Sequence, residues 1–72
     1  ISDGAAAAVL MSAEAAQRLG ATPLARVVAY AGHAHEPEWF TTAPIEATRR
    51  VLEKAGWSVD DVDLFEINEA FA

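Results

Sequence analysis

Residues 62–72 read Val-Asp-Leu-Phe-Glu-Ile-Asn-Glu-Ala-Phe-Ala, and this stretch carries the strongest structural signal of the chain. The run over residues 62–67 predicts a strand, and residues 68–72 are typical of the opening of a helix. Asn68 therefore stands where a strand ends, which is where α/β proteins bind their ligands. From this position alone, Asn68 is either a helix N-cap or an amide that orients a substrate oxygen or a water.

The residues before this stretch predict an amphipathic helix over residues 44–55. Pro44 suits the first position of a helix, and Gly56 is a natural C-terminal residue. Helical spacing places one set of side chains on a single, mostly apolar face: Ile45, Thr48, Val51, Leu52 and Ala55. The opposite face is charged and is expected to be solvated: Glu46, Arg49, Arg50, Glu53 and Lys54.

Farther upstream, the chain alternates between apolar runs and helix signals. Residues 5–11 (Ala-Ala-Ala-Ala-Val-Leu-Met) predict a strand buried on both faces, with a helix starting near Asp3 as the alternative. Ser12 is a good N-cap for a helix over residues 13–19 that stops at Gly20. Residues 24–31 predict another strand, and residues 32–43 form the longest irregular stretch.

The order strand, helix, strand, loop, helix, strand, helix start predicts an α/β fold. Three strands and one full amphipathic helix cannot cover both faces of a sheet, so we expect further elements beyond this chain. The sequence opens at Ile1 without an initiator Met and stops at Ala72 without a polar tail. We therefore expect the 72 residues to be a piece of a longer protein.

Composition excludes several classes of site and of partner. The chain has no Cys, which removes a disulfide framework, a cysteine zinc site and a thiol nucleophile from these 72 residues. Its net charge of −6 argues against a non-specific nucleic-acid or anionic-membrane surface. No apolar run reaches the roughly 18 residues of a membrane span, so we expect a soluble, cytoplasmic protein.

His33 and His35 lie in the irregular stretch with Glu36 beside them. On a strand the two imidazoles would face the same side and could chelate a metal ion, but the pattern provides no third or fourth ligand. We therefore predict solvated loop histidines and no metal site.

Four ordered blocks of the sequence resemble the thiolase family. They are residues 3–12 (Asp-Gly-Ala-Ala-Ala-Ala-Val-Leu-Met-Ser), 37–44 (Pro-Glu-Trp-Phe-Thr-Thr-Ala-Pro), 53–57 (Glu-Lys-Ala-Gly-Trp) and 68–72 (Asn-Glu-Ala-Phe-Ala). The resemblance covers essentially the whole chain, and the second block is most similar to the acetyl-CoA acetyltransferase branch of the family.

The resemblance implies an internal fragment of a thiolase-like fold, with a mixed sheet layered with helices. Residues 1–32 are similar to the end of the N-terminal half of a thiolase, and residues 33–72 to the linker loop and the start of the C-terminal half. The family's two catalytic cysteines and its Gly-His-Pro histidine would lie outside this chain. Gly32-His33 is followed by Ala34 and so does not match that histidine motif.

The resemblance also implies an activity and its residues. Thiolases condense two acetyl-CoA to acetoacetyl-CoA or cleave 3-ketoacyl-CoA in fatty-acid metabolism, as homodimers or homotetramers and without a covalently bound cofactor. By the family's pattern, Asn68 is catalytic and holds a water of the oxyanion hole. Phe71 lines the pantetheine channel, and Phe40 stands beside the acyl pocket where many relatives have Met. The alternative is a non-catalytic acidic α/β interaction module.

Overall fold

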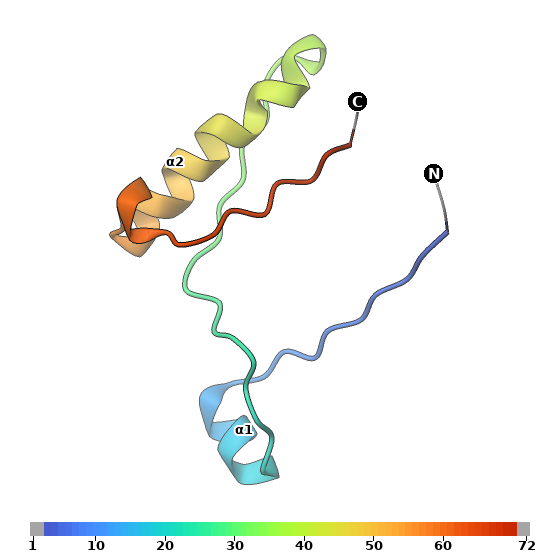
Figure 1. Ribbon diagram of the computed structural model, residues 1–72, viewed down its shortest axis with the longest axis vertical. Helices are drawn as coiled ribbons and strands as arrows, with labels where there is room; N and C mark the ends of the chain where they lie inside the picture. Colours follow the sequence, from blue (N-terminus) through green and yellow to red (C-terminus); the bar gives the residue numbers. More distant parts are fainter. Residues whose placement is uncertain (1–2, 71–72) are drawn as a thin grey trace.

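The computed structural model describes residues 3–70, which contain two α-helices and two short 3₁₀ helices. In chain order the elements are α1 (Ala13–Leu19), η1 (Pro37–Thr42), α2 (Ala43–Ala55) and η2 (Val59–Asp61). Long irregular segments precede α1, join α1 to η1, and follow η2 (Figure 1).

Helix α1 confirms the predicted residues 13–19 and both of their end signals. The Ser12 hydroxyl oxygen accepts a hydrogen bond from the Ala15 N–H at 3.1 Å, which satisfies one of the free donors of the first turn. At the other end Gly20 has a φ of 66°, and the N–H of Ala21 bonds to the carbonyl of Ala16 at 2.9 Å. This arrangement is a Schellman motif, which needs a residue that tolerates the left-handed conformation.

Helix α2 begins one residue before the predicted start and ends at the predicted residue. Pro44 lies in its first turn, and Gly56 ends it with a φ of 70°. The bond from the Trp57 N–H to the Leu52 carbonyl, 3.0 Å long, completes a second Schellman motif. Two ion pairs on the outer face join Glu46 to Arg49 at 3.3 Å and to Arg50 at 3.7 Å.

The three predicted strands do not form within the described residues. Residues 5–11, 24–31 and 62–67 carry no strand, and no backbone hydrogen bond joins any of these segments to another. A strand needs a hydrogen-bonded neighbour for its N–H and C=O groups, and none of the three segments finds that neighbour among residues 3–70. Residues 68–70 are likewise not helical, and Phe71 and Ala72 lie outside the described residues.

Two of these segments nevertheless run along α2. A cavity of about 430 Å³ lies between the helix and residues 26–29, 62 and 65. Its helical wall is made by Thr48, Val51, Leu52 and Ala55, which are four members of the predicted apolar face. The amphipathic pattern of α2 therefore does direct that face toward the two segments that were expected to be strands.

Polar contacts from α2 hold one of these segments in place. Arg50 donates a hydrogen bond to the Gly32 carbonyl at 3.2 Å, and the Lys54 ammonium donates one to the Tyr30 carbonyl at 3.1 Å. The Lys54 nitrogen also lies 5.5 Å from the centre of the Tyr30 ring, within cation–π distance. The face of α2 that was expected to be merely solvated thus contributes two tertiary contacts.

Burial is slight in the described chain. Ala16 is the only one of the described residues that is buried, whereas Leu24 is 100% and Val9 85% exposed. The radius of gyration is 16.0 Å, against about 11 Å expected for a compact domain of this length. Apolar surface of this extent requires a covering layer that residues 3–70 do not supply.

The two 3₁₀ helices were not predicted. Pro37 starts η1, so the second half of the expected loop over residues 32–43 is helical. Ser58 and Asp61 form a capping box around η2, in which the Ser58 N–H bonds to the Asp61 carboxylate at 2.7 Å. The Ser-x-x-Asp spacing is a recognised helix-start signature, so this turn was readable from the sequence.

Candidate functional site

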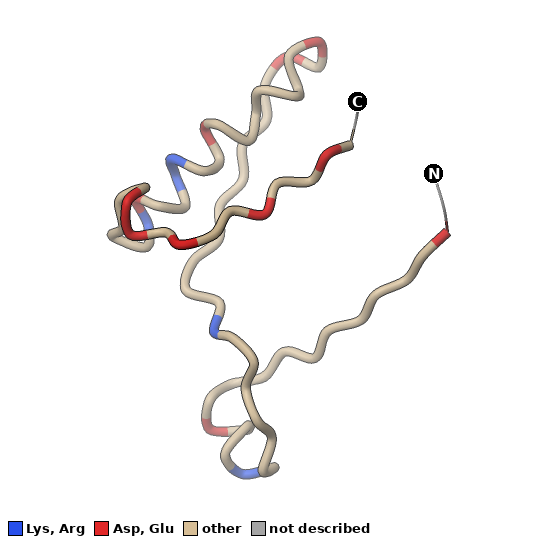
Figure 2. Tube along the Cα trace, viewed as in Figure 1, with Lys and Arg blue, Asp and Glu red and all other residues tan. Residues whose placement is uncertain are grey.

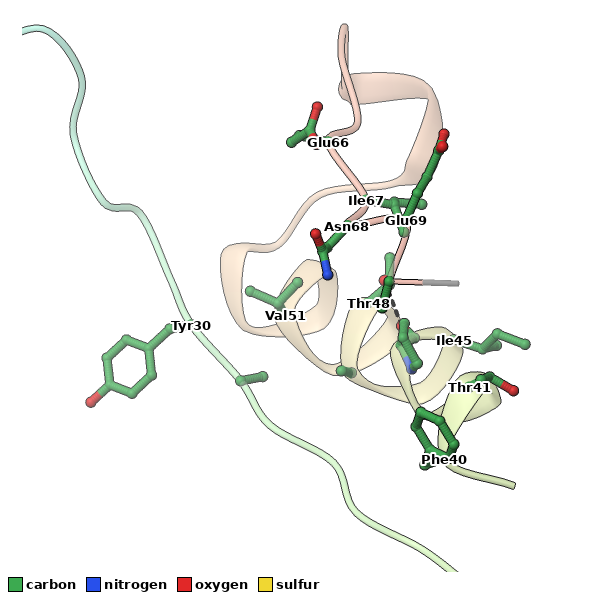
Figure 3. A pocket seen from close by; sticks show the side chains of 14 residues that line it. Tyr30, Phe40, Thr41, Ile45, Thr48, Val51, Glu66, Ile67, Asn68 and Glu69 are labelled. Carbon is green, nitrogen blue, oxygen red and sulfur yellow. Dashed lines mark hydrogen bonds between the residues drawn. The ribbon is translucent and has the colours of Figure 1, made fainter. Parts of the chain in front are cut away.

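A cavity of about 890 Å³ brings four segments of the chain together (Figure 3). Its walls are Tyr30 and Ala31, the end of η1 at Phe40 and Thr41, the first two turns of α2, and residues 66–70. The helical wall comprises Pro44, Ile45, Ala47, Thr48 and Val51. The site is thus built where the segment that ends at Asn68 passes over the apolar face of α2.

Asn68 lies on the wall of this cavity. Its side chain is directed toward α2 (Figure 3). No hydrogen bond joins Asn68 to another of the residues that the structure describes, so its amide makes no contact there that competes with a ligand. An amide offers two N–H donors and one carbonyl acceptor, and can therefore hold a water or a carbonyl oxygen.

Phe40 lines the same cavity from η1. The residue is about half exposed, at 54%, and its side chain lies near those of Thr41 and Ile45 (Figure 3). The structure therefore brings together two of the three predicted site residues, Asn68 and Phe40, which are far apart in the sequence. The third, Phe71, lies outside the described residues.

The remaining wall residues determine what kind of ligand group fits. The charged side chains among the lining residues are Glu66 and Glu69, with no Lys, Arg or His among them. Acidic residues also follow one another along the C-terminal segment without an intervening basic residue (Figure 2). A phosphate group would be repelled here, whereas a neutral acyl or thioester group suits the apolar wall and the Asn68 amide.

Tyr30, Ile45, Thr48 and Val51 are cavity residues that sequence reasoning did not assign to a site. The helical pattern did place the last three on the mostly apolar face of α2, but it gave no indication that this face lines a cavity. The Thr48 hydroxyl donates to the Pro44 carbonyl at 2.7 Å, so its hydrogen is already used within α2 and the hydroxyl oxygen can offer a ligand only an acceptor.

The two histidines are arranged differently from the prediction. His33 and His35 are half-buried, and their ring nitrogens Nε2 and Nδ1 lie 3.2 Å apart. Both lie in an irregular segment, as expected, but they are not simply solvated, since His35 also reaches the Trp39 carbonyl at 2.6 Å. Among residues 3–70, no group of three or more His, Cys, Asp or Glu side chains is placed to hold a metal ion.

No helix in the described part of the chain is both long enough and apolar enough to cross a membrane.

Comparisons with known proteins show which proteins the chain resembles. The chain is 54% identical over its whole length to an acetyl-CoA acetyltransferase of Paracoccus denitrificans, of which it spans 18%. It is 51% identical to the cytosolic acetyl-CoA acetyltransferase of Mus musculus and to the mitochondrial one of Homo sapiens, of which it spans 18% and 17%. No solved structure matches the chain.

A family model described as the C-terminal domain of thiolase matches residues 21–72. This range contains every wall of the cavity, from Tyr30 to Ala70. Since the match covers well over half of the chain and the relatives align with all of it, the chain belongs to the thiolase family.

Proposed function

We propose that this chain is a segment of a thiolase-type acyltransferase, which condenses two acetyl-CoA to acetoacetyl-CoA or cleaves 3-ketoacyl-CoA by thiolysis. One observation carries the proposal: Asn68 and Phe40 line a single cavity in a chain of the thiolase family. The relatives named acetyl-CoA acetyltransferase support the substrate class, and they are much longer than this chain.

Asn68 is the catalytic residue of the proposal. Its amide would hold a water that, with a histidine from elsewhere in the enzyme, stabilises negative charge on the thioester oxygen. Such stabilisation is effective because the donor is already aimed at the place where charge develops. The support is the position of Asn68 on the cavity wall and its lack of a hydrogen bond to any other described residue.

Phe40 and Phe71 are the substrate-binding residues. Phe40 would form the wall against the acyl chain, and Phe71 would line the channel for the pantetheine arm. The apolar residues that line the cavity together with Phe40, among them Ile45 and Val51, support the first assignment. A coenzyme A thioester acts here as substrate, and we propose no covalently bound cofactor.

The rest of the enzyme must supply the nucleophile. The 72 residues contain no Cys, so the thiol that accepts the acyl group and the thiol that acts as acid and base would come from other parts of the protein. This segment alone would therefore be inactive. Phosphates of coenzyme A would also be bound elsewhere, because the described cavity wall is acidic.

We also propose how the segment fits into the whole fold. Residues 1–32 would end the N-terminal half, and residues 33–72 would form the linker loop and begin the C-terminal half. Residues 5–11, 24–31 and 62–67 would pair with strands of the remaining chain in a mixed sheet, which accounts for their exposed apolar side chains. We propose a cytoplasmic homodimer or homotetramer; relatives named as cytosolic and as mitochondrial both occur.

The test uses the full-length protein that carries this segment. It should catalyse both thiolysis of acetoacetyl-CoA and condensation of acetyl-CoA. Phe40→Met should change the ratio of kcat/KM between acetoacetyl-CoA and a longer 3-ketoacyl-CoA by roughly 10–200-fold at most, the range for one methylene in an apolar pocket. Ser58→Ala is the control, because Ser58 caps η2 and is not part of the cavity wall.

Two results would contradict the proposal. A full-length protein without turnover on either substrate would favour the acidic interaction module. Equal effects of Phe40→Met on all chain lengths would show that Phe40 has only a structural role.

A further inference from the structure

The hydrogen bonds around His35 close the segment between residues 33 and 42 into a ring of polar contacts. His35 Nε2 lies 2.6 Å from the Trp39 carbonyl oxygen and 3.2 Å from the Thr42 hydroxyl. The Thr42 hydroxyl also donates to the Trp39 carbonyl at 2.8 Å. On its other side, His35 Nδ1 lies 3.2 Å from His33 Nε2, with the two rings edge to face at 88°.

The partners assign the hydrogens of this network. A backbone carbonyl can only accept, so the hydrogen between His35 and Trp39 must be on His35 Nε2. In the neutral ring this makes His35 Nδ1 an acceptor, and His33 Nε2 must then donate to it. The directions follow: His33 donates to His35, and Thr42 donates to the Trp39 carbonyl. The His35 Nε2–H donates to the same carbonyl and is shared with the Thr42 hydroxyl oxygen, which accepts because its own hydrogen is already used.

The shared acceptor is the carbonyl next to Phe40. The peptide plane that carries the Trp39 oxygen also contains the Phe40 nitrogen and Cα, so fixing this plane fixes the direction of the N–Cα bond from which the Phe40 side chain projects. Trp39 has a φ of −110° and a ψ of 16°, which departs from helical geometry inside η1. Two side-chain donors occupy this carbonyl, and they hold the backbone where the 3₁₀ helix is irregular.

We infer that His35 and Thr42 are positioning residues for Phe40, and that His33 supports His35. Through the Trp39 carbonyl, they set the orientation in which the Phe40 ring forms the wall of the cavity. The inference rests on the proposed function, because it assumes that Phe40 forms the wall against the acyl chain. It adds that acyl-chain selectivity also depends on residues outside the cavity wall. Neither histidine nor Thr42 lines the cavity, so none of them touches the substrate in this assignment.

The experiment uses the full-length enzyme and two pairs of variants. His35→Leu and Thr42→Val each remove one donor to the Trp39 carbonyl with little change in volume. His35→Gln and Thr42→Ser keep a donor and are the matched controls. The measured quantity is the ratio of kcat/KM for acetoacetyl-CoA to that for a longer 3-ketoacyl-CoA, with the melting temperature recorded for each variant.

We expect each donor-removing variant to shift this ratio roughly tenfold, since displacements of about 1 Å in a site can change rates by about 10²-fold. Each control should restore most of the original ratio. In a Phe40→Met background, the same changes should have a much smaller effect, because the positioned ring is gone; this coupling is what a double-mutant cycle measures.

The outcomes separate this inference from the proposed function. Lower melting temperatures with an unchanged ratio would overturn the positioning role, as would equal shifts with and without Phe40. If Phe40→Met itself leaves the ratio unchanged, the acyl-pocket assignment fails first. If His35→Leu does not fold, Thr42→Val and Thr42→Ser decide the question, since they differ least from the native side chain.

Discussion

Asn68 offers the sharpest separation between a catalytic role and a structural one. The perturbation is Asn68→Ala in the full-length enzyme, which deletes the amide from the cavity wall and leaves the backbone unchanged. If the amide holds an oxyanion-hole water, turnover should fall by about 10²–10³-fold, which corresponds to about 2.7–4 kcal/mol of transition-state stabilisation. KM should change far less, because the interaction strengthens in the transition state.

The competing interpretation is that Asn68 is a helix N-cap. The described residues do not support an N-cap. Asn68 makes no hydrogen bond to a described backbone N–H, and residues 68–70 are not helical. An N-cap would contribute about 1 kcal/mol to stability. Its loss would therefore lower the melting temperature and leave the activity per folded molecule nearly intact.

Asn68→Asp is the matched variant. Aspartate caps a helix as well as asparagine does, but it places a negative charge where an oxyanion would form. Turnover and melting temperature should be measured on the same preparations of Asn68→Ala and Asn68→Asp. An Asn68→Asp enzyme with a normal melting temperature and greatly reduced turnover supports the oxyanion hole. Unchanged turnover in that enzyme would refute it.

Three further predictions concern stability. The isolated 72-residue chain should show no steep cooperative transition in a denaturant titration followed by circular dichroism, because Ala16 is the only buried residue of residues 3–70; a sharp transition at micromolar concentration would contradict this. In the full-length enzyme, Ser12→Ala should lower the free energy of unfolding, measured by chemical denaturation, by about 1 kcal/mol, because it removes the 3.1 Å hydrogen bond from the Ala15 N–H. Ser12→Asp should leave the free energy of unfolding nearly unchanged, because aspartate also caps a helix. Gly56→Ala should lower the free energy of unfolding by about 1–2 kcal/mol through backbone strain alone, since φ is 70° and no atom lies close to an added Cβ. Asn tolerates this conformation better than Ala does, so an equal loss for Gly56→Asn would argue against backbone strain.

The helix ends were predictable because their causes are local. Ser12 caps a donor three residues away, and Gly20 and Gly56 each end a helix through bonds that span five residues or fewer. Such signals act within one turn of the backbone, so a single sequence contains all of the interacting groups. The capping box of Ser58 and Asp61 is equally local, and the turn that it starts could have been predicted on the same grounds.

The strand predictions concerned a different kind of interaction. The apolar run over residues 5–11 and the mostly apolar segments over residues 24–31 and 62–67 indicate burial, but a strand exists only with a hydrogen-bonded neighbour. The described chain provides no such neighbour, and the side chains of these runs remain largely exposed. The pattern of residue types thus predicted which segments need a neighbouring strand. It could not predict which residues provide that strand.

The candidate site shows the same division. The sequence alone determined that Asn68 follows a segment with strand character, that Phe40 stands between two prolines, and that α2 has one mostly apolar face. Only the tertiary structure decided that Asn68 and Phe40 share one cavity, and that His35 and Thr42 donate to the carbonyl beside Phe40. The features known from the sequence depend only on residue type and on spacing along the chain. The features that only the tertiary structure decided depend on how segments far apart in sequence are placed around α2, as when Lys54 bonds to the Tyr30 carbonyl and Arg50 to the Gly32 carbonyl.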